Sequence, residues 1–268
     1  MKKLGLLCMC LLLACIVRAQ CETQNLAFNA GEKVTYDLYF NWKFVWVKAG
    51  TAQMQISDTK YHGKPAYRTF LQTKGNKRAD FFFIMRDTLE SVMSHDLVPY
   101  YFRKGAEEGS RYTVDEVNFS YKDGKSYIKQ SRHRNGREPK YSQQVEEYCV
   151  YDMLSILARA RSFDPSDYKV GQKILFPMAT GVAVEEQTLI FRGREVVEAN
   201  DGQKYRCLKF SLVEYKNKKE KEVITFFISD DMNHLPIRLD MYLNFGSAKA
   251  FLTSIQGNRH PITSLIKK

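Results

Sequence analysis

Hydrophobic and polar residues alternate along most of the chain. Between positions 237 and 245 every odd residue is apolar and most even residues are polar. This is the pattern of a strand that has one face against a core and the other in water. The same period of two runs through residues 34–40, 52–57 and 208–212. The patterning therefore predicts a mainly β protein made of antiparallel strands.

Turn-forming sequences lie between these strand patterns. They are His62-Gly63, Asp123-Gly124, Asn135-Gly136, Asp201-Gly202 and Gly246-Ser247. Gly, Asn and Asp tolerate the positive φ angles that tight hairpin turns require. Strands and turns at such regular spacing predict a large curved antiparallel sheet or a barrel-like sandwich.

One segment near residues 150–162 has helical spacing instead. Val150, Met153, Leu154 and Leu157 mark one face, and Asp152 can cap the start. The sequence 163–165 ends in proline, which disfavours helix in the residue before it. We expect this helix to connect two β halves of one composite domain, residues 20–162 and 163–268.

The two halves share three landmarks in the same order. These are Gly31 and Gly171 before a strand, Tyr67-Arg68 and Tyr205-Arg206 after a turn, and the strand starts at Pro99 and Pro236. The offsets are 140, 138 and 137 residues. A nearly constant offset indicates a repeated structural unit. Both halves are expected to share one sheet system, because either alone would expose a long strand edge.

Residues 1–19 have the features of a secretory signal peptide. A basic start is followed by an apolar stretch of 14 residues and by Ala19, a small residue suited to cleavage. The stretch is shorter than the ~20 residues that span a bilayer, so we expect a periplasmic protein without a membrane span. The alternative is a lipid anchor on Cys15, in the sequence Leu12-Leu13-Ala14-Cys15.

Export changes how the basic charge is interpreted. Without the signal the chain has 38 basic against 30 acidic residues, a net charge of +8. In an exported protein, diffuse basicity favours solubility or attraction to anionic envelope polymers, and no nucleic-acid partner is expected. The basic runs 132–137 and 216–222 lie between strand patterns and are expected to be solvated hairpin tips.

Three cysteines follow the signal, namely Cys21, Cys149 and Cys207. An odd number permits at most one internal disulfide in an oxidising compartment. Cys149–Cys207 is the possible disulfide, with Cys21 free near a chain end. The alternative is that Cys149 and Cys207 are both buried free thiols.

Four segments, in order, resemble one known family. They are Gly31-Glu32 with Tyr36, the sequence 46–52, the sequence 85–91, and Asp230-Asp231 followed by Leu235-Pro236 and Arg238. Together they are similar to the exported bacterial family called domain of unknown function 3108. The resemblance covers residues 27–257. It implies a β-rich envelope protein of Gram-negative bacteria and supplies no activity.

Catalytic motifs are missing from the sequence. It contains no HExxH, GxSxG, P-loop or GxGxxG pattern. No two histidines lie at the spacing that would present both to one metal, so neither a metal nor a cofactor is expected. Adjacent acids on a strand face opposite sides and cannot act as a glycosidase pair, although distant acids can meet in the fold.

The best candidate surface is the sequence 41–46, where both tryptophans of the protein lie four residues apart and are expected on the same strand face as Phe44. If exposed, these rings would form a platform for a sugar ring or lipid tail; if buried, they are core. The candidate ligand-binding residues are Trp42, Phe44, Trp46, Arg86, Tyr100 and Arg238.

Three function classes remain open. The first is a non-enzymatic binding, carrier or scaffold module for an envelope lipid, glycan or protein, which predicts a concave and partly apolar groove. The second is a hydrolase of envelope polymers, which requires two converging acids, one with a raised pKa. The third is a structural assembly partner, which predicts one large exposed apolar patch.

Overall fold

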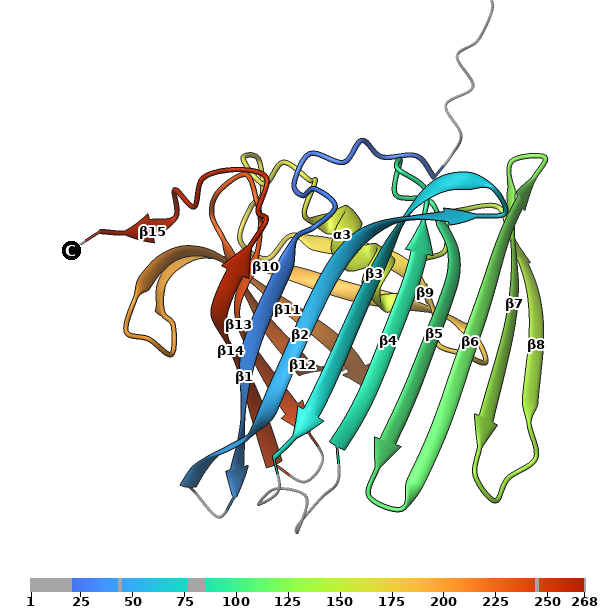
Figure 1. Ribbon diagram of the computed structural model, residues 1–268, viewed down its shortest axis with the longest axis horizontal. Helices are drawn as coiled ribbons and strands as arrows, with labels where there is room; N and C mark the ends of the chain where they lie inside the picture. Colours follow the sequence, from blue (N-terminus) through green and yellow to red (C-terminus); the bar gives the residue numbers. More distant parts are fainter. Residues whose placement is uncertain (1–20, 43–44, 77–84, 244–245, 268) are drawn as a thin grey trace, which may run out of the picture.

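The computed structural model describes residues 21–42, 45–76, 85–243 and 246–267, so the proposed signal peptide and Cys15 lie outside it. A fifteen-stranded antiparallel sheet curves around the interior of the molecule (Figure 1). The prediction of a mainly β protein with a large curved antiparallel sheet is confirmed. The elements are β1 (Lys33–Trp42), β2 (Val45–Tyr61), β3 (Lys64–Gly75), β4 (Met85–Met93), β5 (Pro99–Glu108), β6 (Arg111–Lys122), β7 (Lys125–Arg134), β8 (Lys140–Glu146), α3 (Met153–Ala160), β9 (Lys173–Ala179), β10 (Val184–Glu198), β11 (Lys204–Lys216), β12 (Lys219–Ser229), β13 (Pro236–Leu243), β14 (Gly246–Gln256) and β15 (Leu265–Ile266).

The chain runs through the sheet as two meanders joined in the middle. The strand order is β8-β7-β6-β5-β4-β3-β2-β1-β14-β13-β12-β11-β10-β9, with β15 added on β11. The first strand, β1, pairs with β14 near the end of the chain. One continuous sheet therefore contains both halves, and β8 and β9 form its two edges.

Side-chain and main-chain contacts link the two edges without strand pairing between them. Tyr151 forms an isolated parallel bridge to Met178 of β9. Arg132 of β7 donates to the carbonyl of Thr180 at 2.7 Å, and the Gly181 amide donates to Gln130 at 2.9 Å. The sheet is consequently barrel-like but open along this seam.

The helix α3 fills the interior near one end of this barrel. Asp152 caps it by accepting from the amides of Leu154 and Ser155, both at 2.9 Å, as the sequence predicted. Its side chains join three buried clusters, because Leu154 packs in one, Leu157 against a second and Ala158 in a third. The helix is therefore the common core element of both halves.

Matching backbone conformations occur at corresponding points of the two halves. Gly31 and Gly171 have φ angles of +96° and +87°, and each donates its amide to a carbonyl of a neighbouring strand, at 2.8 Å. Leu97 and His234, each two residues before the proline that starts β5 or β13, have φ angles of +59° and +44°. The division of the chain at residue 162 stays a prediction.

A buried ion pair holds α3 against both halves. The guanidinium of Arg161 donates to both carboxylate oxygens of Glu32, at 2.6 and 2.8 Å. It also donates to the carbonyl of Asn233 at 3.0 Å, in the turn between β12 and β13. The side chains of Arg161 and Glu32 are 2% and 1% exposed. Such a pair tolerates burial because each charge has its partner and its hydrogen bonds.

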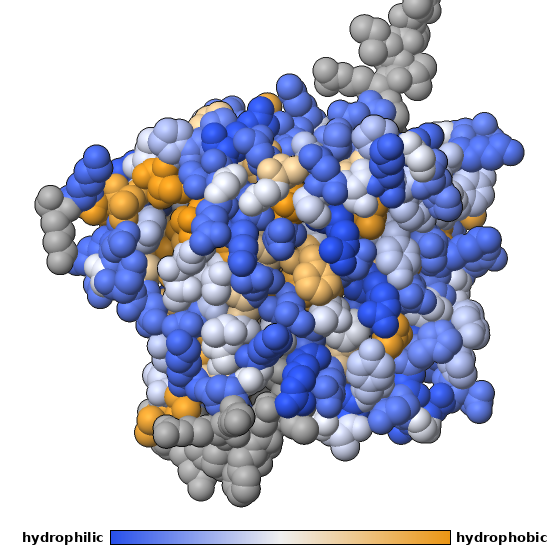
Figure 2. Space-filling model, in the orientation of Figure 1, coloured by the Kyte–Doolittle hydropathy of each residue, from blue (hydrophilic) through white to orange (hydrophobic). Residues whose placement is uncertain are grey.

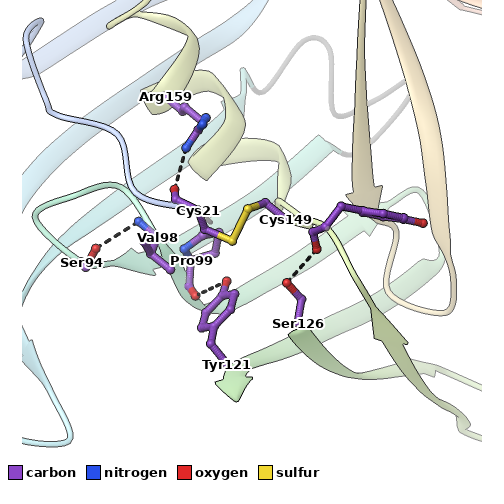
Figure 3. The surroundings of a disulfide bond; sticks show 9 residues. Cys21, Ser94, Val98, Pro99, Tyr121, Ser126, Cys149 and Arg159 are labelled. Atoms are coloured by element: carbon purple, nitrogen blue, oxygen red, sulfur yellow. Dashed lines mark hydrogen bonds between the residues drawn. A yellow bond between two sulfur atoms is a disulfide. The ribbon is translucent and has the colours of Figure 1, made fainter. Parts of the chain in front are cut away.

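The disulfide joins Cys21 to Cys149 (Figure 3). The sequence-based pairing of Cys149 with Cys207 is wrong, and so is a free Cys21. Cys21 lies on the segment that precedes β1, where its carbonyl accepts from Arg159 of α3 at 2.6 Å. Cys207 is a buried free thiol, and burial raises its pKa to about 12, which makes it unreactive.

Replacing Glu32 by Gln should destabilise the protein strongly. The change leaves the Arg161 charge buried without its counter-ion, which costs about 3–5 kcal/mol in comparable sites. The free energy of unfolding in urea measures the loss. The control is Glu195→Gln, which breaks the more exposed pair with Lys209 and should cost at most about 1 kcal/mol. Equal losses in the two variants would show that the buried pair is not a major support.

Replacing Cys149 by Ser should lower the free energy of unfolding by about 2–5 kcal/mol, because a long loop gains freedom in the unfolded chain. The bonded cysteines are 128 residues apart. Wild-type protein in reductant should unfold like the variant. Peptide mapping should recover Cys21 linked to Cys149, and alkylation of native protein should spare Cys207. A Cys149–Cys207 peptide would contradict the structure.

Candidate functional site

Most of the concave interior is filled, and a charged cleft remains at the end away from α3. Its volume is about 210 Å³. The sequence predicted a partly apolar groove for a binding module, but the residues that line this cleft are mainly charged. The lining residues are Lys104, Ala106, Glu108, Arg111, Thr113, Asp115, Arg132 and Arg134, which come from β5, β6 and β7.

Strand register places these side chains on one face. Lys104 is opposite Asp115 on the next strand, and Asp115 is opposite Arg132 on the one after. Residues two apart on a strand share a face, so Arg134 joins Arg132 and the buried Ile128 on the inner side of β7. The row is a direct result of alternation along three adjacent strands.

The floor of the cleft is a tight contact between β6, β7 and the β9–β10 turn. Arg132 donates to both oxygens of the buried Asp115 carboxylate, at 2.6 and 2.8 Å. Gly181 packs against Asp115, and a Cβ atom there would lie 2.6 Å from the carboxyl carbon. Only glycine fits this approach, and its φ of +93° also favours glycine.

Positive charge exceeds negative charge in the cleft. Arg111 is paired with Glu108, and Arg132 with Asp115. Within the described part of the chain, neither Lys104 nor Arg134 forms a salt bridge. Two cationic groups thus face the cleft without a bound carboxylate, which is the arrangement expected of an anion site.

An incompletely paired carboxyl group lies beside the cleft. Asp87 of β4 is opposite Ala106, and its buried Oδ1 has no hydrogen-bond partner among the described residues. Burial is the main cause that raises the pKa of Asp87; Lys104 lowers it and Glu108 raises it further. Perturbed carboxyl groups of this kind gather at functional sites.

Among the described residues, no group of three or more His, Cys, Asp or Glu side chains is placed to hold a metal ion. No helix in the same part of the chain is both long enough and apolar enough to cross a bilayer.

The two tryptophans do not share one strand, contrary to the sequence-based interpretation. The register pairs Trp42 with Val45 and Asn41 with Trp46, so a hairpin turn separates them. Phe44 and the side chain of Trp42 lie outside the described residues. Trp46 is 39% exposed, and the amine of Lys249 lies 4.7 Å from the centre of its ring.

The remaining candidate ligand residues are not brought together. Arg86 is exposed and forms an ion pair with Glu107 at 3.5 Å. Tyr100 stacks on Tyr61, with ring centres 5.3 Å apart. Arg238 donates to both carboxylate oxygens of Asp240 on its own strand, at 2.7 and 2.5 Å. A ligand role for any of them stays a prediction.

The basic run 132–137 was expected to be a solvated tip; residues 133–137 are exposed, whereas Arg132 is half-buried. Arg132 and Arg134 line the cleft, and only the end of the run forms the β7–β8 turn. The signal that could have found them is the alternation of β7, which places both on the face of Ile128 and Gln130.

The fold of this chain is similar to that of a solved β-barrel-like protein. A β-barrel-like protein of domain of unknown function DUF1849 from Brucella abortus aligns over 86% of this chain and 98% of its own, with a TM-score of 0.55 and 9% identity. A protein from Bacteroides fragilis described as having a YmcC-like fold aligns over 87% and 99%, with a TM-score of 0.36 and 9% identity. A comparison with curated proteins found no match.

The family model described as protein of unknown function (DUF3108) matches residues 35–253, and the chain belongs to this family. The resemblance stated from the sequence is confirmed.

Proposed function

We propose that this protein is an exported binding module whose cleft accepts an anionic group of a cell-envelope lipid or glycan. The observation that carries the proposal is the presence of Lys104 and Arg134 in the cleft without a salt-bridge partner among the described residues. Lys104 is half-buried and Arg134 is exposed at the end of β7. A phosphate or carboxylate would supply the missing counter-charge.

The volume of the cleft limits what it can hold. Pockets for drug-sized ligands occupy about 300–1,000 Å³, and this cleft is about 210 Å³. Packed side chains around α3 occupy the interior above it. The cleft therefore suits a head group or a single sugar acid better than an acyl chain, and the proposed module recognises the polar end of its ligand.

Export is supported by two independent features. Residues 1–19 have the sequence of a secretory signal, and disulfides such as Cys21–Cys149 persist in oxidising compartments. Cleavage after Ala19 gives a free periplasmic protein, whereas acylation of Cys15 gives a lipid-anchored one. Both routes retain Cys21 in the mature chain.

Replacing Lys104 and Arg134 by Gln should weaken binding of dihexanoyl phosphatidylglycerol, a soluble phosphate-bearing probe, by at least about tenfold. Each lost charge-assisted contact is worth about 1.5–3 kcal/mol. Isothermal titration calorimetry at low ionic strength measures the affinity. The matched control is Lys129→Gln, an exposed lysine of the same strand β7. Absence of wild-type binding, or an equal loss in the control, would refute the anion cleft.

A second candidate function is supported by the carboxyl groups of Asp87 and Glu108. The raised pKa of Asp87, to which Glu108 contributes, keeps its carboxyl group protonated to higher pH than usual. A carboxylic acid that stays protonated to higher pH, beside a second carboxyl group, is the arrangement used in general acid catalysis by glycosidases. On this proposal the protein hydrolyses an envelope glycan.

The hydrolase proposal makes a pH-dependent prediction. Release of soluble fragments from purified peptidoglycan should fall as the pH rises through the raised pKa of Asp87, because the acid form is lost. Asp87→Asn and Glu108→Gln should each abolish the release. Glu107→Gln, on the adjacent and more exposed carboxylate, should leave it unchanged. If wild-type protein releases nothing between about pH 4 and 8, the hydrolase proposal fails and the binding proposal is unaffected.

A further inference from the structure

Two neighbouring hairpin ends expose large apolar side chains. The β1–β2 and β13–β14 hairpins are adjacent because β1 pairs with β14. The exposed residues, called the tip patch below, are Val45 (61% exposed), Trp46 (39%), Val47 (46%), Tyr242 (42%) and Leu243 (41%). Figure 2 shows a small hydrophobic area at its lower left corner and a larger one at its upper left, on a face that is otherwise mostly hydrophilic.

The tip patch is apolar on both faces of its hairpins. Val45, Trp46 and Val47 are consecutive on β2, so their side chains alternate between the two sides of the sheet. All three are exposed. A surface that packs on a protein partner normally uses one face of a hairpin. Apolar side chains on both faces of a protruding hairpin end are buried together only by surroundings that contact both faces.

Lysine is the charged residue nearest in sequence to the tip patch. Residues 40–50 and 241–250 contain no Asp or Glu, and they contain Lys43, Lys48 and Lys249. Lys48 forms an exposed ion pair with Asp37 at 2.7 Å, and Lys249 lies 3.9 Å from Asp240, so both amines can turn to an anionic group at small cost. Both tryptophans of the chain also lie in the first of these segments. Tryptophan favours the boundary between water and lipid, and lysine near that boundary is attracted to anionic head groups.

We infer that the tip patch inserts into the surface of an anionic lipid bilayer. Val45, Val47 and Leu243 enter the apolar boundary, Trp46 and Tyr242 lie at head-group depth, and Lys48 and Lys249 contact lipid phosphates. The inference does not rest on the anion cleft, whose residues lie on β5, β6 and β7.

Flotation with vesicles tests the inference on the chain from Gln20 onward, which includes every described residue. Vesicles of phosphatidylglycerol and phosphatidylethanolamine should carry the protein upward, and vesicles of phosphatidylcholine should carry much less. Tryptophan emission should shift to shorter wavelength on binding, because the only tryptophans are Trp42 and Trp46. The variant Val45→Ser, Val47→Ser, Leu243→Ser should bind at least about tenfold more weakly.

The matched control replaces two equally exposed valines elsewhere, Val170→Ser and Val196→Ser, which are 74% and 57% exposed. This control should float like the wild type, and the tip variant should still bind dihexanoyl phosphatidylglycerol in the cleft. Failure of the wild type to float with anionic vesicles, or equal flotation of the tip variant, overturns the inference. A concentration-dependent dimer that the tip variant loses, without vesicle binding, would assign the tip patch to a second copy of the chain.

Discussion

The ion pair between Arg161 and Glu32 fixes three distant parts of the chain at one point. Glu32 lies directly before β1, Arg161 ends α3, and the carbonyl of Asn233 belongs to the β12–β13 turn. Removing both charges from water is costly, and the bidentate geometry with a third hydrogen bond offsets that cost. Since β1 is the strand that joins the two meanders, its start sets the position of each half. Glu32, one of the residues that carry the family resemblance, therefore has a structural role.

This constraint closes one end of the barrel and leaves the other accessible. Around the ion pair, the segment before β1 crosses the end of the sheet (Figure 1). The last part of the chain binds it through Arg259, which donates to the carbonyl of Asn25 at 2.8 Å, and the disulfide ties it to the residues before α3. A ligand can approach the interior only where packing is incomplete, so the charged cleft lies at the opposite end.

Local patterns predicted the sheet, the helix and many turns, because each depends on neighbouring residues. Asp123 and Gly124, with φ angles of +52° and +73°, form the kind of hairpin turn that their sequence favours. The β1–β2 turn at residues 43–44 has no Gly, Pro, Asn or Asp, so the sequence 41–46 was interpreted as one strand. The pairing of Cys21 with Cys149 depends on proximity across 128 residues, which no local pattern encodes.

The cleft occurs where the two halves differ. β1 to β6 and β9 to β14 follow the same course, with glycine of positive φ before the first strand and proline at the start of the fifth. β7 and β8 have no counterpart in the second half, and β7 supplies Arg132 and Arg134. The β9–β10 turn, which packs on Asp115 through Gly181, completes the floor. The repeated strands thus form the framework and contribute Lys104, Arg111 and Asp115, and the added hairpin completes the cleft with Arg132 and Arg134, which is how a site is commonly built onto a stable fold.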